Sequence, residues 1–479
     1  MVPRGEERGG FVAVPGGRIT PTVLWRRKKT EREVEVESQE QAVEQRLERA
    51  DPATLRKVVV GVGLGNFMEW FDFGLYGYLA TTLAIVFFPS EDPAVGLLAT
   101  FAVFGVAFVI RPLGGLVLGP LGDKIGRQRL LAGVIILMAL STFSIAFLPG
   151  YASVGIWAPI LLVIARAAQG LSASAEFGGG ATFLAEYSPD ERRGFFVSFL
   201  QFSSLIGFGS GLLLVQFLSS TLSEDALTSW GWRIPFLIAG PLGLIGLYIR
   251  LRLEDTPEFR ALERAGQVAQ APLRETITQN WREMLQVGGI AILQNVGFYL
   301  VLTYVQTYII QLGYPRSSAT LSTALTILVT MALLPLLGAF SDRRGRKPLL
   351  IASSVGFAVL SYPLFLFMSQ GGLPSVVLGH VALGILLALF ISVNMTVLVE
   401  LLPTRVRVGG FSIGYNISVA IFTGPAAALS TYLISLTGNQ AAPAFYIIFA
   451  AALTLVTLLT IRETAGTPLR HTQVQPQEA

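Results

Sequence analysis

Twelve long apolar stretches run through this chain, each at least about as long as the roughly 20 residues that a helix needs to cross a bilayer. Strands this apolar would leave no polar face for a lumen, so helices are the only plausible spanning element. Turn residues such as Pro149-Gly150 and Gly371-Gly372 separate the stretches. We therefore expect an all-α membrane protein with spans near 58–87, 95–119, 130–149, 155–184, 195–220, 233–250, 285–312, 318–340, 348–369, 374–400, 410–436 and 443–462.

The composition agrees with a chain embedded in a membrane. Hydrophobic residues make up 52% of the sequence and charged residues 14%, whereas a soluble domain carries about 25% charged residues. The absence of cysteine excludes disulfides, thiolate metal sites and a cysteine nucleophile. Two histidines are too few for a multi-histidine metal site, so we expect neither a metal nor a cofactor.

Two different motifs each occur twice. Gly119–Arg127 and Gly338–Arg346 both fit G-x-x-x-D-[KR]-x-G-R and link apolar stretches, while Glu186–Arg193 and Glu400–Arg407 both fit E-x-x-P-x-x-x-R. The two motifs repeat at nearly the same offset, which indicates a chain built from two copies of one structural unit, as in many secondary transporters. We expect twelve transmembrane helices in two pseudo-symmetric six-helix halves.

The chain divides into five regions on this basis. The first residues are rich in Arg, Glu and Gly and have no apolar core, so they are not a signal peptide, and we expect a disordered or partly helical tail. The expected regions are an N-terminal tail at 1–54, the halves at 55–250 and 285–462, a central loop at 251–284 and a short polar tail at 463–479.

Lys and Arg residues set the expected orientation. They gather in the loops after the second, fourth, sixth, eighth and tenth spans, whereas the opposite loops hold Arg233 and Arg316. The positive-inside rule then places the basic loops and both termini in the cytoplasm, in a multi-pass protein of the plasma membrane. The expected partners are the lipid bilayer, a small organic solute and protons, with no nucleic acid, and the chain is expected to be a monomer.

Ionisable residues inside the spans are confined to the N-terminal half, at Glu69, Asp72, Arg111, Arg166 and Glu176, apart from His380 and from Glu400 at a helix end. Such groups are costly in a membrane unless they are paired or hydrated, and they often mark ion pathways. A buried carboxylate is the usual proton carrier because burial favours its neutral form. The three acids are therefore candidates for proton coupling; the alternative is structural pairing that holds neighbouring spans together.

Helical spacing predicts partners for these charges. Glu69, Asp72 and Tyr76 share one face of the first span. Arg111 lies at a depth from which it can reach that face, so we predict that it pairs with Glu69 or Asp72. The acid that pairs with Arg111 is the weaker proton carrier, unless substrate binding breaks the pair. Glu176 has no basic residue within two turns on its own helix and is the better candidate.

Polar and aromatic residues in the spans are candidates for substrate binding. Amides in the C-terminal half can hydrogen-bond a solute at the midplane, or can tie helices together. Arg166 could meet a carboxylate, or could be an interhelical arginine. Trp70, Phe71, Phe73, Tyr76, Tyr299 and Tyr304 could form a cation–π box, or could be packing contacts. The predicted substrate residues are Asn66, Trp70, Tyr76, Arg111, Arg166, Gln169, Asn295, Tyr299, Asn394 and Asn416.

The repeated loop motif has chemistry of its own. Asp123 with Arg127, and Asp342 with Arg346, are i, i+4 neighbours, and each Asp can also accept hydrogen bonds from helix N-terminal amides. A topogenic role would explain the basic residues but not the repeated Asp and Gly. Glu186 with Arg193, and Glu400 with Arg407, are expected to extend the same network.

The doubled loop motif resembles the signature of the major facilitator superfamily. Further stretches, Glu69–Phe73, Arg111–Gly115, Ala185–Pro189 and Gly231–Phe236, resemble the metabolite–proton symporter family, and the proline/glycine-betaine transporters look most similar. The resemblance implies the major facilitator fold, and loops that latch the cytoplasmic side while the outer side is open. The latch residues would be Gly119, Asp123, Arg127, Glu186, Arg193, Gly338, Asp342, Arg346, Glu400 and Arg407.

These observations predict a proton-coupled symporter that imports a small zwitterionic solute, such as proline or glycine betaine, by alternating access. One alternative is a proton symporter of a dicarboxylate, citrate or shikimate, because Arg111 and Arg166 suit carboxylates equally well. Another is a transport-dead membrane sensor that binds a partner through its N-terminal tail. An enzyme is not expected, because the spans hold no histidine–carboxylate or serine–histidine arrangement.

Overall fold

The computed structural model describes residues 52–469. Nearly all of the tail predicted at 1–54, and the end of the tail predicted at 463–479, lie outside the described residues. In the N-terminal half the crossings are α2 (Pro52–Tyr78) continued by α3 (Ala80–Phe87), α4 (Pro93–Ile125), α5 (Arg127–Ile145), α7 (Trp157–Tyr187), α8 (Arg193–Thr221) and α10 (Arg233–Leu251). Short helices α6 (Tyr151–Val154) and α9 (Glu224–Ala226), with the turns η1 (Asp190–Arg192) and η2 (Leu227–Gly231), connect them.

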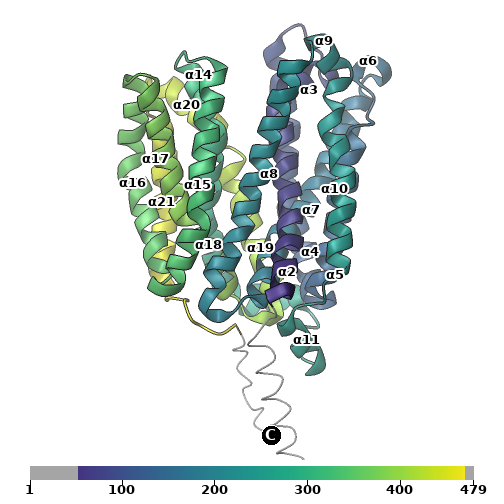
Figure 1. Ribbon diagram of the computed structural model, residues 1–479, viewed down its shortest axis with the longest axis vertical. Helices are drawn as coiled ribbons and strands as arrows, with labels where there is room; N and C mark the ends of the chain where they lie inside the picture. Colours follow the sequence, from purple (N-terminus) through teal and green to yellow (C-terminus); the bar gives the residue numbers. More distant parts are fainter. Residues whose placement is uncertain (1–51, 470–479) are drawn as a thin grey trace, which may run out of the picture. The chain divides into compact units, whose positions relative to one another are not determined.

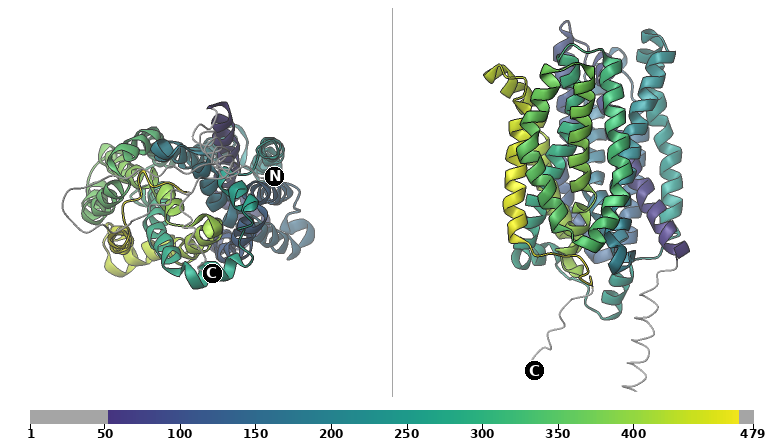
Figure 2. Two further views of the ribbon diagram at one scale, coloured as in Figure 1. Left: turned by 90° about the horizontal axis from the view of Figure 1, so that it is seen from below. Right: turned by 60° about the vertical axis from the view of Figure 1, so that its left-hand side comes forward.

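The C-terminal half repeats this plan. Its crossings are α13 (Trp281–Tyr299) with η3 (Leu300–Tyr304) and α14 (Val305–Gln311), α15 (Arg316–Arg344), α16 (Lys347–Gln370), α17 (Leu373–Ile391) with α18 (Asn394–Glu400), α19 (Arg407–Ser418) with η5 (Val419–Thr423) and α20 (Ala426–Thr437), and α21 (Pro443–Thr460). Helices α11 (Pro257–Arg264) and α12 (Pro272–Gln279) lie between the halves in the chain, and the turn η4 (Thr404–Val406) precedes α19. The two groups of helices stand side by side in Figures 1 and 2.

Eleven helices of the described chain are long and apolar enough to cross a membrane. The crossing predicted at 410–436 is the twelfth, and it is divided into α19, η5 and α20. Gly424-Pro425 separates η5 from α20, because proline has no amide hydrogen to continue the helical ladder. The described chain contains three π-helical turns, a feature that is frequent at functional sites: η3 and η5 lie within crossings, and η2 leads into α10.

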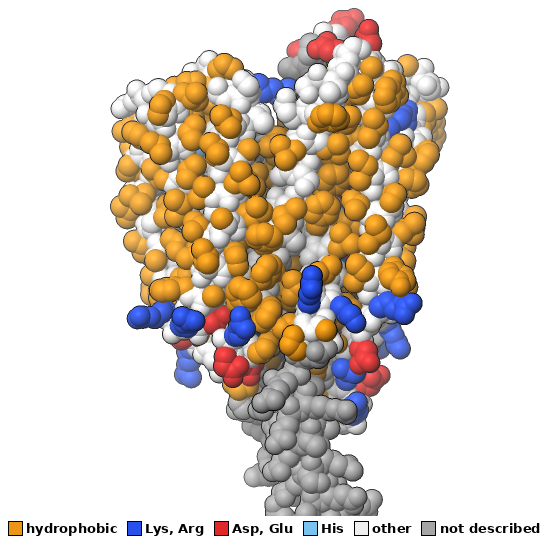
Figure 3. Space-filling view, in the orientation of Figure 1, with side chains coloured by type: hydrophobic (Ala, Val, Ile, Leu, Met, Phe, Trp, Pro, Cys, Tyr) orange, Lys and Arg blue, Asp and Glu red, His pale blue; other side chains and the backbone are white. Residues whose placement is uncertain are grey.

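The outer surface has the pattern of a protein that faces lipid. Large hydrophobic side chains such as Leu140, Leu244 and Leu336 are exposed along the helices, and in Figure 3 hydrophobic side chains form a broad apolar band. Lys and Arg gather at the lower margin of that band in the figure. We call this end, which holds Gly119–Arg127 and Gly338–Arg346, the basic end. The chain is therefore a multi-pass membrane protein.

The repeated motif is more helical than the sequence indicates. Asp123 and Asp342 lie in the last turns of α4 and α15. The chain turns only at Gly126 and Gly345, whose φ angles of 102° and 100° require glycine. The predicted spans 95–119 and 318–340 are thus too short, because charged residues in the last turn lowered the apparent hydropathy without ending the helix.

Candidate substrate cavity and gating network

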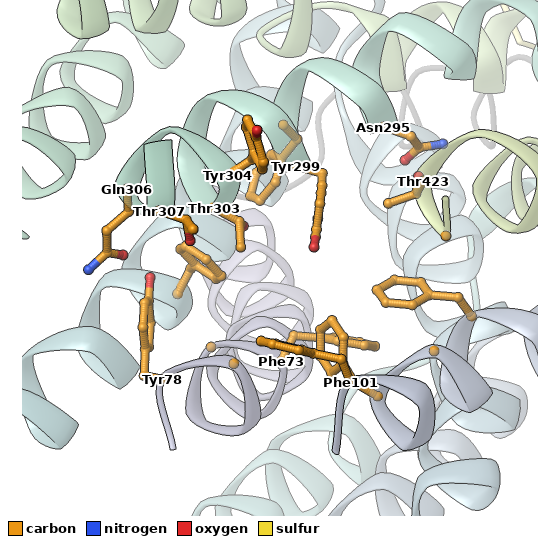
Figure 4. A pocket seen from close by; sticks show the side chains of 18 of the residues that line it. Phe73, Tyr78, Phe101, Asn295, Tyr299, Thr303, Tyr304, Gln306, Thr307 and Thr423 are labelled. Atoms are coloured by element: carbon orange, nitrogen blue, oxygen red, sulfur yellow. The ribbon is translucent and has the colours of Figure 1, made fainter. Parts of the chain in front are cut away.

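A cavity of about 980 Å³ lies between the two halves. The N-terminal half contributes Trp70, Phe108 and Arg111 to its wall, and the C-terminal half contributes Asn295 and Tyr299. Figure 4 shows side chains from both halves that line this space. The lining extends to Leu98 and to Arg316, the first residue of α15, so the cavity runs toward the end of the molecule opposite the basic end.

A chain of hydrogen bonds forms part of the cavity wall. The hydroxyl of Tyr415 accepts from Gln294 Nε2 at 3.1 Å and donates to Asn295 Oδ1 at 2.8 Å. Asn394 donates to the side-chain oxygen of Gln294. These bonds orient Asn295 so that its Nδ2 has no hydrogen-bond partner among the described residues, and the indole nitrogen of Trp70 has none either. Two buried donors on the cavity wall are therefore available to an anionic ligand.

Aromatic rings make up much of the cavity wall. The ring of Trp70 lies 4.3 Å from that of Phe298, centroid to centroid, and 6.2 Å from that of Phe73. Tyr299 and Tyr304 also line the cavity, so four of the six rings expected for a cation–π box are present there. The other two are not part of this wall. Phe71 stacks on Phe67, and the Tyr76 hydroxyl donates to the Thr100 carbonyl at 3.2 Å.

All five charges inside the N-terminal spans form ion pairs. Arg111 Nη2 lies 2.7 Å from Glu69 Oε1, which confirms the predicted pairing of Arg111. Arg166 Nη1 lies 2.9 Å from Asp72 Oδ2. Arg166 also donates to Gln169 at 2.8 Å and does not appear in the cavity wall, so in this conformation it is an interhelical arginine rather than a cavity residue.

Glu176 has a basic partner, although no basic residue lies within two turns on its own helix. Both oxygens of Glu176 accept from the guanidinium of Arg250, one of them at 2.8 Å, and Arg250 also donates to the Leu131 carbonyl at 2.6 Å. Spacing along one helix cannot reveal this partner because Arg250 comes from α10, whereas Glu176 is on α7. The Cβ atom that an alanine would have at Gly65 lies 1.9 Å from Arg250 Nη2, so only glycine accommodates the pair there.

Of the ten predicted substrate residues, Trp70, Arg111, Asn295 and Tyr299 line the cavity. The others are engaged elsewhere, mostly in contacts between helices. Asn66 donates to the Leu200 carbonyl and to two serines of α8, and Asn416 donates to the Ser174 carbonyl of α7 at 2.7 Å. The residues not in the wall are Asn66, Tyr76, Arg166, Gln169, Asn394 and Asn416.

At the basic end, each repeated Asp binds the start of a helix in the other half. Asp123 accepts from the backbone amides of Val408 and Gly409 at 3.1 and 2.7 Å, at the start of α19. Asp342 accepts from the amides of Gly194 and Phe195 at 2.8 and 2.9 Å, at the start of α8. The prediction that these acids accept from helix N-terminal amides is confirmed. The amides belong to the opposite half in both cases.

The glutamates and arginines of the second motif also pair across the halves. Glu186 lies 2.5 Å from Arg407, and Glu400 lies 2.8 Å from Arg193. The prediction that Glu186 with Arg193, and Glu400 with Arg407, extend the network of the first motif is confirmed, and each acid pairs with the arginine of the other copy. We call these residues, together with Asp123, Arg127, Asp342 and Arg346, the crossed network. Arg127 and Arg346 approach Glu186 and Glu400 at 3.5 Å each.

Two family descriptions match this chain: "Sugar (and other) transporter" over residues 58–275 and "Major Facilitator Superfamily" over residues 316–478. The chain is 41% identical over 430 residues to the glycine betaine/proline/ectoine/pipecolic acid transporter OusA of Dickeya dadantii, covering 88% of this chain and 86% of the relative. It is 40% identical, with the same coverage, to the proline/betaine transporter of Escherichia coli. The chain belongs to the major facilitator superfamily.

Further comparisons agree with this assignment. The ectoine/proline transporter ProP of Corynebacterium glutamicum is 38% identical over 437 residues, which cover 87% of this chain and 86% of the relative. The structure of the proton:xylose symporter XylE bound to 6-bromo-6-deoxy-D-glucose superposes with a TM-score of 0.73, at 19% identity, over 87% of this chain and 98% of that one. This major facilitator protein is a solute transporter, similar to proline/betaine transporters.

Sequence reasoning missed a third repeated device in this transporter. Asp255, just after α10, accepts from the amides of Arg127 and Gln128 at the start of α5. Glu463, just after α21, accepts from the amides of Arg346 and Lys347 at the start of α16. Each acid follows the last crossing of its half and caps the N-terminus of a helix in that same half. The available signal was an acid followed by threonine, Asp255-Thr256 and Glu463-Thr464, after the final span of each copy.

The pKa values of the two capping acids are shifted in opposite directions. Burial raises the pKa of Asp255 above its ordinary value, although backbone donors and Arg127 oppose that shift. Burial also acts on Glu463, but there the backbone amides of Arg346, Lys347, Thr464 and Ala465 outweigh it, so the pKa of Glu463 is lowered. Glu463 therefore holds its cap as a carboxylate across the neutral pH range.

Residues 461–469 add a strap across the basic end of the transporter. Arg193 of the N-terminal half donates to the Thr467 carbonyl at 3.0 Å. Arg407 of the C-terminal half donates to the Leu469 carbonyl at 3.3 Å, and Thr464 donates to Glu400 at 2.5 Å. The strap thus contacts both ion pairs of the crossed network and is hydrogen-bonded to both halves.

Proposed function

We propose that this protein is a proton-coupled symporter that imports a small zwitterionic solute of the proline or betaine type by alternating access. The observation that carries the proposal is the position of Arg111. Its side chain lines a cavity with aromatic walls between the two halves, and that cavity is closed at the basic end by the crossed network. A solute in this space would contact both halves, as alternating access requires.

The chemistry of the wall suits a molecule with both charges. Arg111, the Trp70 indole and the Asn295 amide would bind a carboxylate. The faces of Trp70, Phe298 and Tyr299 would attract a quaternary or secondary ammonium group through cation–π interactions. Among the described residues that line the cavity, none is Asp or Glu, so a cation would be held by rings rather than by a fixed negative charge.

A dicarboxylate or another carboxylic acid is the second candidate. Arg316 also lines the cavity, near its mouth, so two arginines contribute to one wall. A substrate with two carboxylates could contact both in turn. The similarity to transporters of glycine betaine, proline and ectoine favours the zwitterion.

We further propose that the basic end faces the cytoplasm of a plasma-membrane protein that acts as a monomer. Lys and Arg at this end support the orientation through the positive-inside rule. In that orientation the cavity runs toward the outside, and the crossed network together with the strap keeps the cytoplasmic side closed. Import would then require the halves to rock and these contacts to separate.

Uptake into liposomes tests the proposal. Purified protein is reconstituted, and accumulation of labelled glycine betaine, proline and succinate is measured with and without an imposed inward proton gradient. We expect gradient-dependent accumulation of betaine or proline. Accumulation of succinate alone would support the second candidate, and accumulation that ignores the proton gradient would contradict proton coupling.

A further inference from the structure

We propose that Glu69 carries the transported proton, and that the carboxylate of the substrate triggers protonation of Glu69 by becoming the new partner of Arg111. This inference rests on the proposed function and adds the coupling step to it. It is drawn from the arrangement of one arginine, one acid and the cavity, and it selects a single acid among the three in the N-terminal spans.

Arg111 is the link between the cavity and the acid. Its side chain lines the cavity, whereas Glu69 is absent from the wall and has no exposed surface. Arg111 Nη2 donates to Glu69 Oε1 at 2.7 Å. The guanidinium also lies over the rings of Phe73 and Phe108, at 4.8 and 5.5 Å from their centroids. The rings would keep Arg111 in place while its hydrogen bonds turn from the buried acid to a ligand.

No other cation near Glu69 is free to replace Arg111 among the described residues. Arg166 on α7 pairs with Asp72, and Arg250 on α10 pairs with Glu176. The remaining ionisable groups that act on Glu69 are Asp72 on its own helix, Glu176 on α7 and Tyr415 on α19. Helix α8, which packs on α2, carries no ionisable side chain after Arg193.

Glu69 would therefore become a buried acid without a countercharge when a ligand takes Arg111. Its Oε2 already has no hydrogen-bond partner among the described residues. A buried carboxylate in apolar surroundings without a countercharge favours its neutral form. Under these conditions Glu69 takes up a proton, which arrives from the aqueous side to which the cavity is open.

The charges of Arg111 and Glu69 are each neutralised at every step, while the ammonium of the zwitterion adds one positive charge to the loaded site. Without substrate, Arg111 and Glu69 form a neutral pair. With substrate, the solute carboxylate neutralises Arg111 and the added proton neutralises Glu69. When the solute leaves on the other side, Arg111 returns to Glu69 and the proton is released there. One zwitterion and one proton would thus cross together, because neither loaded state is favourable without the other.

The two other acids are poorly placed for this exchange. Asp72 accepts from Arg166 at 2.9 Å and from Gln169 at 2.6 Å, and Glu176 accepts from Arg250 on both oxygens. The partners Arg166 and Arg250 do not line the cavity, so a solute in this conformation has no direct contact with either. Among the described arginines that hold buried acids, a ligand in this space reaches Arg111 alone.

The test compares Glu69→Gln with a matched control, Glu224→Gln, which changes an exposed acid of α9. Proton uptake is measured in weakly buffered detergent solution as glycine betaine is added, and binding is measured in parallel. We expect wild type and Glu224→Gln to take up about one proton per solute bound. We expect Glu69→Gln to bind betaine without proton uptake, and in liposomes to retain exchange while gradient-driven accumulation falls at least about tenfold.

Two results would overturn the inference: proton uptake by Glu69→Gln equal to that of wild type, or wild-type accumulation that follows the proton gradient without proton uptake on binding. Glu69→Asp, which keeps an ionisable group, should retain coupling and serves if Glu69→Gln does not fold. Choline, which has no carboxylate, should cause no proton uptake in wild type. If wild type accumulates none of the solutes, with or without the proton gradient, it is the proposed function that fails.

Discussion

Glu186 on α7 and Arg407 on α19 form an ion pair of 2.5 Å between the two halves, and its counterpart in the second copy joins Arg193 and Glu400 at 2.8 Å. All four side chains are almost completely buried. A duplicated unit has thus placed each acid against the arginine of the other copy. Because both pairs span the boundary between the halves, each must separate when the halves move apart at the basic end.

Glu186→Gln is expected to favour opening of the basic end, since it leaves Arg127 and Arg407 without their shared carboxylate. Removing one partner of a buried ion pair typically costs about 3–5 kcal/mol of stability. The chain has no cysteine, so Ser198→Cys, at the contact between α8 and α15, can report opening by its rate of thiol labelling. We expect faster labelling in Glu186→Gln. The control is Glu191→Gln, an exposed acid nearby, and equal rates in both would contradict the role of the pair.

Gly338→Ala should also open the basic end, for a steric reason. A Cβ at Gly338 would lie 2.6 Å from the Gly194 carbonyl oxygen and 2.9 Å from Ser198 Cβ, so α15 and α8 could not approach as closely. Gly133→Ala has nothing within 4 Å and is the matched control. A cysteine introduced at Ser341 reports opening by its rate of thiol labelling, as in the previous experiment. Unchanged labelling in Gly338→Ala would show that the close approach does not hold the gate.

Gly65→Ala is expected to destabilise the protein by displacing the Glu176–Arg250 pair. The new Cβ would lie 1.9 Å from Arg250 Nη2 and 2.4 Å from Glu176 Oε1, whereas a Cβ at Gly63 would lie 3.5 Å from its nearest neighbour. We expect a loss of about 3 kcal/mol or more, as for other disrupted buried charges. Thermal unfolding in detergent compares the two variants. A transition temperature for Gly65→Ala equal to that of Gly63→Ala would contradict the prediction.

Tyr415→Phe should weaken substrate binding without altering the gate. The hydroxyl that fixes Asn295 is lost, so the Asn295 amide is free to turn its oxygen toward the ligand. The loss of one oriented donor corresponds to about 1.4 kcal/mol, or roughly a tenfold increase in KM for uptake. Tyr151→Phe, at an exposed tyrosine, is the control. A change in kcat alone would point to a role other than substrate contact.

The cap made by Glu463 should weaken in acid. Its pKa is lowered in the folded protein by backbone donors that outweigh burial, so its contribution to stability is present above the ordinary value of 4.5 and is lost as pH falls below it. We expect the transition temperature of wild type to fall toward low pH more steeply than that of Glu463→Gln, which has lost the effect at every pH. Parallel curves for the two proteins would contradict this assignment.

The fold could be predicted from coarse features of the sequence. Apolar length and the two repeated motifs predicted the twelve crossings and the two halves, because span length and duplication are properties of single segments. The segmented crossing at Gly424-Pro425 and the helical position of Asp123 were not predicted. Both depend on whether a helix continues through a residue that hydropathy treats as a break.

The site was less accessible from sequence because its contacts join helices that are distant in the chain. The Arg111–Glu69 pair was predicted, since depth along two neighbouring spans limits the choices. The Arg250 partner of Glu176, and the exchange of partners between Glu186 and Glu400, depend on which helices pack together. Asn394 and Asn416 satisfy the same polarity criterion as Asn295, and only the packing decides which amide faces the cavity.

The strap at residues 461–469 has a practical consequence for anyone who labels this protein. A fluorescent domain or affinity tag inserted directly after Leu469 would be joined to a segment that hydrogen-bonds Arg193 and Arg407. Such an attached group would weaken those hydrogen bonds and shift the equilibrium between conformations of the transporter. The same attachment gives an opportunity, because a dye placed just beyond Leu469 would sense each transport cycle from outside the bilayer.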